Sequence, residues 1–134
     1  MDLQSSETLQ ITCEEDLVRV RQATRARAVL LGLSLVNLTK IVTAASELAR
    51  NTLTFGGGGT AIVATVHNGD RPGLRLIFED HGPGITDIEL AMKDGYTGGK
   101  GLGLGLGGSK RLVNEFEISS RVGEGTRVSI TRWK

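Results

Sequence analysis

The sequence predicts a two-layer α+β sandwich, in which a mixed, mainly antiparallel sheet carries helices on one face. Two long segments repeat apolar residues at helical spacing, and two pairs of alternating runs are joined by turn-rich sequences. Strands joined by short turns are antiparallel, and a helix with one apolar side must cover something flat. A chain of 134 residues is long enough for one ordinary domain, 1–134, with its own core.

The first half of the chain contains two long helices after a short strand at 9–13. The first helix is expected from Glu14 to about Leu31. Its inner side is formed by Leu17, Val20, Thr24, Ala28 and Leu31. The second helix is expected over 36–53. Its inner side is formed by Leu38, Ile41, Val42, Ala45, Leu48 and Ala49. The glycines at 56–59 then end this helix.

The second half of the chain alternates between strands and loops. A strand from Thr60, TAIVATVH, and a strand from Gly73, GLRLIFED, are joined by the turn-forming sequence NGDRPG. The glycines and proline of HGPGI then stop the second strand after Asp80. A short helix near 87–92 and a helix over 104–114 follow. The last segment, FEISSRVGEGTRVSITRW, predicts a second hairpin around GEG.

Composition excludes several classes of function. The formal net charge of +1 gives no electrostatic case for a nucleic-acid partner. No segment has the roughly 18–20 apolar residues that span a bilayer, and MDLQSSETLQ lacks the features of a signal peptide. We therefore expect a cytoplasmic protein with no membrane partner. Cys13, the only cysteine, is expected to be a small buried residue.

Four arginines lie in the first predicted helix, namely Arg19, Arg21, Arg25 and Arg27. Their positions spread around the helix, which favours a solvated surface over a docking face for an acidic partner.

The first candidate site lies on the second predicted helix. Glu47 and Asn51 are four residues apart, so their side chains lie on one side of that helix, away from its apolar centre. A carboxylate beside a carboxamide can bind a hard cation through oxygen or position a hydroxyl for phosphate chemistry. The alternative is an ordinary solvated helix face.

A second candidate site follows the strand that ends at Asp80. This residue continues the buried face of Leu74, Leu76 and Phe78, where an acid needs a partner. It could cap the next turn, or it could accept a hydrogen bond from the exocyclic amine of adenine. Gly82 and Gly84 would let the main chain approach a flat ring. Thr126 in the last strand faces the same layer as Asp80 and could join it at the adenine.

The segment 98–108, GGKGLGLGLGG, is too rich in glycine for regular structure in its first half, and it leads into a helix. Free N–H groups at the start of a helix can bind phosphates. A flexible linker would have the same glycine-rich composition. Neither a dinucleotide-binding fingerprint nor a Walker motif fits this context. The candidate nucleotide contacts here are Lys100, Gly101, Gly103, Leu104, Gly105, Leu106 and Gly107.

The order and spacing of these signals resemble the GHKL ATPases, which have the Bergerat fold. The strings ELARN, DHGPGI, GLGLGLGG and GEGT are similar to the N, G1 and G2 boxes and the final GT of that superfamily. The strings TAASELARNTL, EDHGPGI, KRLVNEFEISS and GEGT most resemble its small serine/threonine kinases and anti-sigma factors. Within that branch the likeness is greatest to the RsbT-type switch kinases of the bacterial stressosome.

This resemblance implies a role for each motif. Glu47 would orient or activate the attacking hydroxyl, and Asn51 would ligate Mg²⁺. Asp80 would bind adenine in a pocket shaped by Gly82 and Gly84, with Thr126 beside it. The glycines of the third motif would form a lid over the phosphates of ATP.

The resemblance also implies a reaction and partners. A serine/threonine kinase of this branch would phosphorylate a STAS-domain protein in a partner-switching stress response, and would then bind and activate a PP2C-type phosphatase. Two alternatives remain open. One is an anti-sigma factor kinase that sequesters a sigma factor, and the other is a non-catalytic module whose protein binding is gated by ATP.

Overall fold

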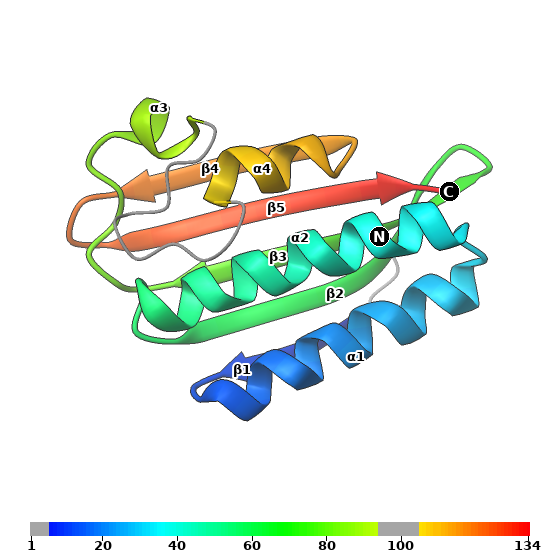
Figure 1. Cartoon of the computed structure of the whole chain (residues 1–134), viewed down its shortest axis with the longest axis horizontal. Coiled ribbons are helices and arrows are strands. Elements are labelled where there is room, and N and C mark those ends of the chain that lie inside the picture. Colours follow the sequence, from blue (N-terminus) through cyan, green and yellow to red (C-terminus); the bar gives the residue numbers. More distant parts are fainter. Residues whose placement is uncertain (1–5, 94–104) are drawn as a thin grey trace.

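The computed structural model describes residues 6–93 and 105–134, and Figure 1 shows its two layers. The elements are β1 (Ser6–Ile11), α1 (Glu14–Leu31), α2 (Leu35–Thr54), β2 (Gly59–Asn68), β3 (Arg71–Asp80), α3 (Ile88–Ala91), α4 (Gly105–Arg111), β4 (Glu115–Arg121) and β5 (Gly125–Trp133). Helices α1 and α2 pack against each other over the sheet, and α4 packs beside α2 (Figure 1).

The sheet has the strand order β1-β2-β3-β5-β4, and each neighbouring pair is antiparallel. This arrangement confirms the predicted two-layer α+β sandwich and its mainly antiparallel sheet. The described strands include no parallel pair. Strand β3 is the central strand. It pairs with β2, to which a short turn connects it, on one side, and with β5 on the other.

The side chains of β3 alternate between the two faces of the sheet. Leu74, Leu76 and Phe78 are buried beneath the helices. Arg75 and Glu79 point to the open face, where they lie near Glu115 and Arg127 respectively. The sheet therefore has one apolar face, which the helices cover, and one polar face, as is common in antiparallel sheets.

The turn between β2 and β3 is shorter than the sequence predicts. Only Gly69 and Asp70 separate the two strands, and Arg71 already pairs with Asn68. Gly69 has a φ of +63°, which two-residue hairpins require and which residues with a Cβ rarely adopt. The turn-forming sequence NGDRPG therefore includes the first residues of β3, and Pro72 lies within the strand.

The two long helices contribute their apolar sides to the core between the helix layer and the sheet. The predicted inner residues Leu17, Val20, Thr24 and Ala28 of α1 are buried, and the Thr24 hydroxyl donates to the Val20 carbonyl at 2.7 Å. Helix α2 is capped at its start by Ser34, whose Oγ accepts a hydrogen bond from a main-chain N–H. No helix in residues 6–93 and 105–134 has both the length and the apolar character needed to cross a bilayer.

The junction between β1 and α1 differs from the prediction at Cys13. Strand β1 ends at Ile11, two residues earlier than expected, so Cys13 lies outside the strand, at the position just before the helix. Its side chain is exposed, and the prediction of a buried cysteine is therefore wrong. Hydrogen bonding to the Glu15 carboxylate is the main cause that raises the pKa of the Cys13 thiol.

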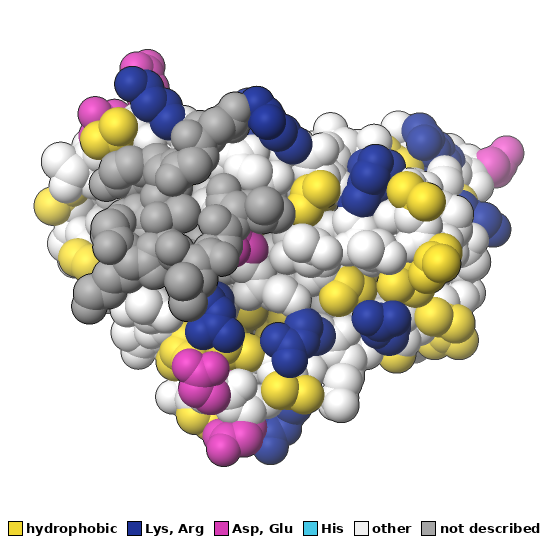
Figure 2. Space-filling model, viewed as in Figure 1, with side chains coloured by type: hydrophobic (Ala, Val, Ile, Leu, Met, Phe, Trp, Pro, Cys, Tyr) yellow, Lys and Arg dark blue, Asp and Glu magenta, His cyan; other side chains and the backbone are white. Residues whose placement is uncertain are grey.

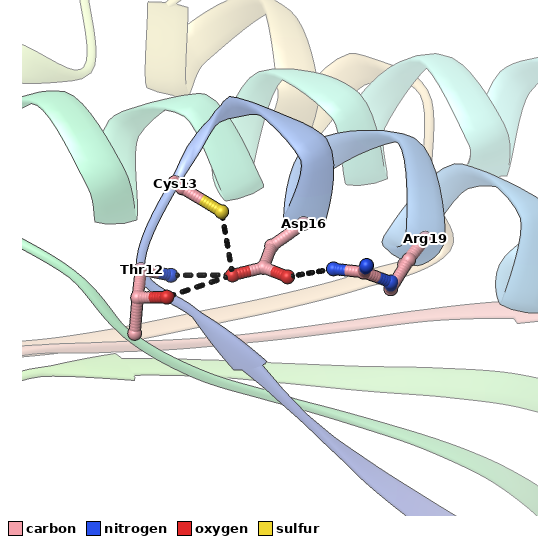
Figure 3. A network of polar contacts seen from close by, with 4 residues as sticks. All are labelled: Thr12, Cys13, Asp16 and Arg19. Carbon is pink, nitrogen blue, oxygen red and sulfur yellow. Dashed lines mark hydrogen bonds and ion pairs between the residues drawn. The ribbon is translucent and has the colours of Figure 1, made fainter.

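Asp16 holds this junction together (Figure 3). Its Oδ2 accepts hydrogen bonds from the main-chain N–H of Thr12 at 2.8 Å and from the Thr12 hydroxyl at 3.0 Å. Its Oδ1 is paired with Arg19 one turn further along α1. The carboxylate thus links the end of β1 to the first turn of α1. The pKa of Asp16 is lowered from 3.8 to about 2. The largest cause is the hydrogen bond from the Thr12 N–H, and the next is the hydrogen bond from the Thr12 hydroxyl.

Replacement of this carboxylate is expected to weaken the fold in a pH-dependent way. Because the pKa of Asp16 is lower in the folded state, its contribution is fully present above pH 3.8 and is lost as the pH falls toward 2. The variant Asp16→Asn should therefore unfold in less urea than the wild type at pH 7. The difference should narrow as the pH falls from about 4 to about 2.

The control is Glu117→Gln, which removes the same charge from an exposed position on β4. Equal urea midpoints for the two variants at pH 7 would contradict the role given to Asp16.

Candidate functional site

Asp80 and Thr126 meet at one end of the sheet. Asp80 is the last residue of β3, Thr126 lies at the start of β5, and the two are direct partners across the antiparallel pair. Both side chains are half-buried. A hollow of about 240 Å³ that they help to line extends to the open face of the sheet, because Glu79, Ser119 and Arg127 also line it. The fold thus brings together two of the residues that the sequence assigned to adenine.

The Asp80 carboxylate is fixed by the loop that follows it. Its Oδ1 accepts a hydrogen bond from the main-chain N–H of Gly82 at 2.9 Å. The main chain of Gly56, just after α2, lies against the same carboxyl group, since a Cβ on Gly56 would come within 2.4 Å of the Asp80 Cγ. Asp80 therefore caps the turn after β3, which is one of the two roles that the sequence predicted for it. Its second carboxylate oxygen can accept a hydrogen bond from another donor.

The glycines near Asp80 allow main-chain segments to touch. A Cβ on Gly82 would lie 2.8 Å from the Cα of Gly56, and a Cβ on Gly84 would lie 2.2 Å from the carbonyl oxygen of Arg121. Protein backbone therefore accounts for both glycines. Their predicted role, close approach of the main chain to a flat ring, stays a prediction.

Ser120 is a residue of this site that the sequence reasoning missed. Its Oγ accepts a hydrogen bond from the N–H of Ile85 at 2.8 Å, and lies 3.1 Å from the carbonyl oxygen of Gly125 and 2.7 Å from the Thr126 Oγ1. It therefore joins the loop after β3 to the hairpin of β4 and β5, and it orients the Thr126 hydroxyl. The signal in the sequence is the pair of serines in NEFEISS, of which only the second faces the helices.

Glu47 and Asn51 lie on the C-terminal half of α2, and both are half-buried. Leu48 and Ala49 between them are buried in the core, so the predicted division of this helix into an apolar and a polar side is confirmed. Figure 1 shows that α2 ends at the same end of the molecule where β3 and β4 end and β5 begins. Main-chain contact of Gly56 with Asp80 joins the two parts of the site.

The glycine-rich segment is described only from Gly105 onward. Lys100, Gly101, Gly103 and Leu104 lie outside the described residues, so their predicted contacts remain predictions. Helix α4 begins at Gly105, and the Ser109 hydroxyl donates to the Gly105 carbonyl at 3.0 Å.

Two further positions of this segment lie within α4. Gly107 is buried, and the side chain of Leu106 is a member of the hydrophobic core. Leu106 can therefore offer a ligand only its main chain.

The chemistry of the donor set fits a magnesium ion that is brought in by a nucleotide. Among residues 6–93 and 105–134, no group of three His, Cys, Asp or Glu side chains is placed to hold a metal by itself. Magnesium commonly takes one or two protein oxygens and completes its shell with phosphate and water. The carboxamide oxygen of Asn51 is the predicted protein ligand, and it requires no such acidic cluster.

The fold and the motifs agree with a family of known proteins. Residues 36–134 match the family described as Histidine kinase-, DNA gyrase B-, and HSP90-like ATPase. The chain belongs to this ATPase family, which confirms the predicted GHKL resemblance.

Within the family the chain is RsbT-like. It is 43% identical, over 93% of its length and 94% of the relative, to the serine/threonine-protein kinase RsbT of Bacillus subtilis. It is 31% identical, over 71% of its length and 70% of the relative, to an anti-sigma F factor of Clostridium kluyveri.

Two solved structures share the fold. A structure of the RsbU and RsbW domains of a Mycobacterium tuberculosis protein matches with a TM-score of 0.63 and 23% identity, over 96% of this chain and 33% of the other. A mycobacterial sensor histidine kinase matches with a TM-score of 0.57 and 18% identity, over 95% and 96% of the two chains. At these identities the likeness establishes the fold.

The close contact at Gly84 can be tested against a matched glycine. Gly84 and Gly123 have φ values of +79° and +80°, but a Cβ on Gly123 would meet no atom within 4 Å. Gly123→Ala should therefore lower the free energy of unfolding by about 1–2 kcal/mol, the cost of the left-handed conformation alone. Gly84→Ala should lose about 1–3 kcal/mol more, because its Cβ overlaps the Arg121 carbonyl. Equal urea midpoints for the two variants would argue against this contact.

The role of Ser120 can be tested against its neighbour Ser119, which is exposed on the opposite face of β4. Ser120→Ala leaves the Ile85 N–H without its acceptor and should lower the free energy of unfolding by about 1–2 kcal/mol. Ser119→Ala should change it by less than about 0.5 kcal/mol. Calorimetric titration with ATP should also give weaker binding for Ser120→Ala only. If both variants bind ATP as the wild type does, Ser120 does not position Thr126 for the nucleotide.

Proposed function

We propose that this chain is an ATP- and Mg²⁺-dependent protein serine/threonine kinase. The observation that carries the proposal is the combination of Glu47 and Asn51 on α2 with the paired Asp80 and Thr126, in a chain of the ATPase family that is 43% identical to a serine/threonine-protein kinase. The first pair supplies groups for phosphoryl transfer, and the second pair supplies groups for nucleotide recognition.

Asp80 and Thr126 are the proposed adenine contacts. One carboxylate oxygen of Asp80 is occupied by the Gly82 N–H, which fixes the plane of the group. The other oxygen can accept a hydrogen bond from the exocyclic amine of adenine, which guanine does not present at that position. The hydroxyl of Thr126, held by Ser120, can act next to it. This arrangement favours ATP over GTP.

Glu47 and Asn51 are the proposed groups for the reaction itself. A bond forms between the acceptor hydroxyl oxygen and the γ-phosphorus, and the bond from the γ-phosphorus to the bridging oxygen breaks, so that ADP leaves with the electron pair. Glu47 takes the proton of the acceptor hydroxyl. Asn51 would hold Mg²⁺, which when bound offsets negative charge on the phosphates.

The proposed substrate is a Ser or Thr on a STAS-domain protein in a bacterial partner-switching stress response, and the proposed second partner is a PP2C-type phosphatase. Both follow from the RsbT-like sequence, and the proposed setting is the cytoplasm. The anti-sigma alternative has the support of a 31% identical relative, against 43% for the kinase. A pull-down separates them, since the alternative predicts capture of a sigma factor.

The kinase proposal predicts different losses at the two residues of α2. The purified chain is incubated with γ-labelled ATP, Mg²⁺ and STAS proteins encoded beside it, and labelled residues are mapped by mass spectrometry. Glu47→Gln should slow transfer by about 100-fold or more while keeping ATP binding, because it removes the proton acceptor. Asn51→Ala should abolish labelling and remove the Mg²⁺ dependence of ATP binding.

The matched control is Thr43→Ala, an exposed position one turn before Glu47 on α2, which should transfer like the wild type. Transfer by Glu47→Gln at the wild-type rate would show that its assigned role is wrong. Tight ATP binding by the wild type with no label on any partner would instead favour a non-catalytic module gated by ATP.

A further inference from the structure

Four aliphatic side chains are exposed together where α1 ends and α2 begins. Val29 and Leu30 of α1 are 61% and 86% exposed, and Leu35 and Val36 of α2 are 76% and 61% exposed. Single exposed aliphatic residues are common, but a contiguous group on a small domain usually marks an interaction site. We call this group, with Arg25 and Lys40 beside it, the hairpin tip.

The hairpin tip is held in place by hydrogen bonds and packing on both sides of its turn. Gly32 ends α1 in the left-handed conformation, with its N–H directed at the last carbonyls of the helix, and Leu33 is buried beneath the loop. Ser34 caps α2 by accepting a hydrogen bond from Asn37 N–H at 3.1 Å, and the Asn37 side chain accepts one from Arg132 at 2.7 Å. The exposed aliphatic groups are therefore presented on an ordered surface, which reduces the entropy lost on binding.

The charge around the hairpin tip has one sign. From Leu17 to Ser46 the chain contains no Asp or Glu, although its total charge is close to zero. Arg25 lies one turn before Val29 on α1, and Lys40 lies one turn after Val36 on α2. In Figure 2, yellow and dark blue side chains lie together over the meeting ends of α1 and α2, with no magenta side chain among them.

The arginines of α1 do not all have the same role. Arg19 and Arg27 are paired within the chain, with Asp16 and Glu7 respectively. Within the described ranges, Arg25 and Lys40 form no ion pair. Arg25 can therefore pair with a carboxylate of another molecule, although the sequence favoured a solvated surface for the four arginines.

We propose that the hairpin tip docks an amphipathic helix of a partner protein, with Leu-type side chains on one face and Asp or Glu along its edges. Apolar side chains would cover Leu30 and Leu35, and the flanking carboxylates would pair with Arg25 and Lys40. A second copy of this chain is a poorer occupant because it would bring like charges together. A membrane surface is also a poorer fit, because the tip has no Trp or Tyr, the residues that are enriched where proteins meet a membrane surface.

The proposal does not depend on the kinase activity. The hairpin tip lies at the start of α2, whereas Glu47 and Asn51 lie in its C-terminal half. Variants of the tip should therefore bind ATP as the wild type does, and a catalytically inactive chain should still bind the helix.

The test uses two synthetic helical peptides and the full isotope-labelled chain. Both peptides carry Leu at every third and fourth position, but one has Glu and the other Lys at the flanking positions. The Glu peptide should shift amide signals around 25–40, and its binding should weaken as NaCl rises from about 50 to about 500 mM. The Lys peptide should leave the spectrum unchanged.

Variants with matched controls separate the apolar and charged contributions. The double variant Leu30→Ser, Leu35→Ser should weaken binding of the Glu peptide by roughly tenfold or more, and Arg25→Glu by roughly fivefold or more. Val18→Ser, at an aliphatic position 41% exposed elsewhere on α1, and Lys93→Glu, at an exposed charge beyond α3, should change it by less than about twofold.

Three results would overturn the proposal. The first is equal binding of the two peptides, or amide shifts that fall away from the hairpin tip. The second is that the chain binds phosphatidylserine vesicles but not the Glu peptide, and that the double variant loses the vesicle binding. The occupant would then be a membrane. The third is a dimer in sedimentation velocity that the double variant dissociates, because the occupant would then be a second copy.

Discussion

Around the end of β3, separate stretches of main chain lie so close together that no side chain fits between them. A Cβ on Gly125 would come within 2.1 Å of the Asp80 carbonyl oxygen, and a Cβ on Gly59 within 2.0 Å of the Glu79 carbonyl oxygen. Both strands that flank β3 thus meet it through a glycine at this end of the sheet. The position of Asp80 depends on these contacts, because they fix the backbone from which its side chain extends.

The same constraint joins the helix layer to the sheet at the candidate site. Gly56, just beyond α2, lies against both Gly82 and the Asp80 carboxyl group. A larger residue at this position would push the end of α2 away from the sheet and separate Asn51 from Asp80. Ser120 adds a polar link of the same kind, between the loop after β3 and the hairpin of β4 and β5. Packing and site geometry are therefore set by the same few contacts.

Helix α2 connects the two proposed functional regions, which have different chemistry. With 20 residues it is about 30 Å long, so its two ends are far apart on the scale of this domain. Its first turn contributes Leu35 and Val36 to the hairpin tip, and its C-terminal half contributes Glu47 and Asn51 to the candidate site. The buried residues between them pack on the sheet, so a single helix carries both the surface proposed for protein contact and the polar groups proposed for the nucleotide.

The sequence by itself determined the fold class, the bounds of α1, and the residues that carry the family resemblance. Helical and strand periodicities are local properties, and the alternation through Leu74, Leu76 and Phe78 was enough to place Asp80 on the helix face of the sheet. The motifs around Glu47, Asn51, Asp80 and Thr126 were likewise readable, because each uses residue types at a fixed spacing.

Only the tertiary structure decided which distant segments touch. The contact of Gly56 with Asp80 and the bonds of Ser120 join residues from different elements, and no local pattern encodes such a distance. Cys13 became exposed because β1 ended early and Asp16 held the junction in place of a buried thiol. The hairpin tip also required the tertiary structure, because the turn at Gly32 is what brings the exposed residues at the end of α1 next to those at the start of α2.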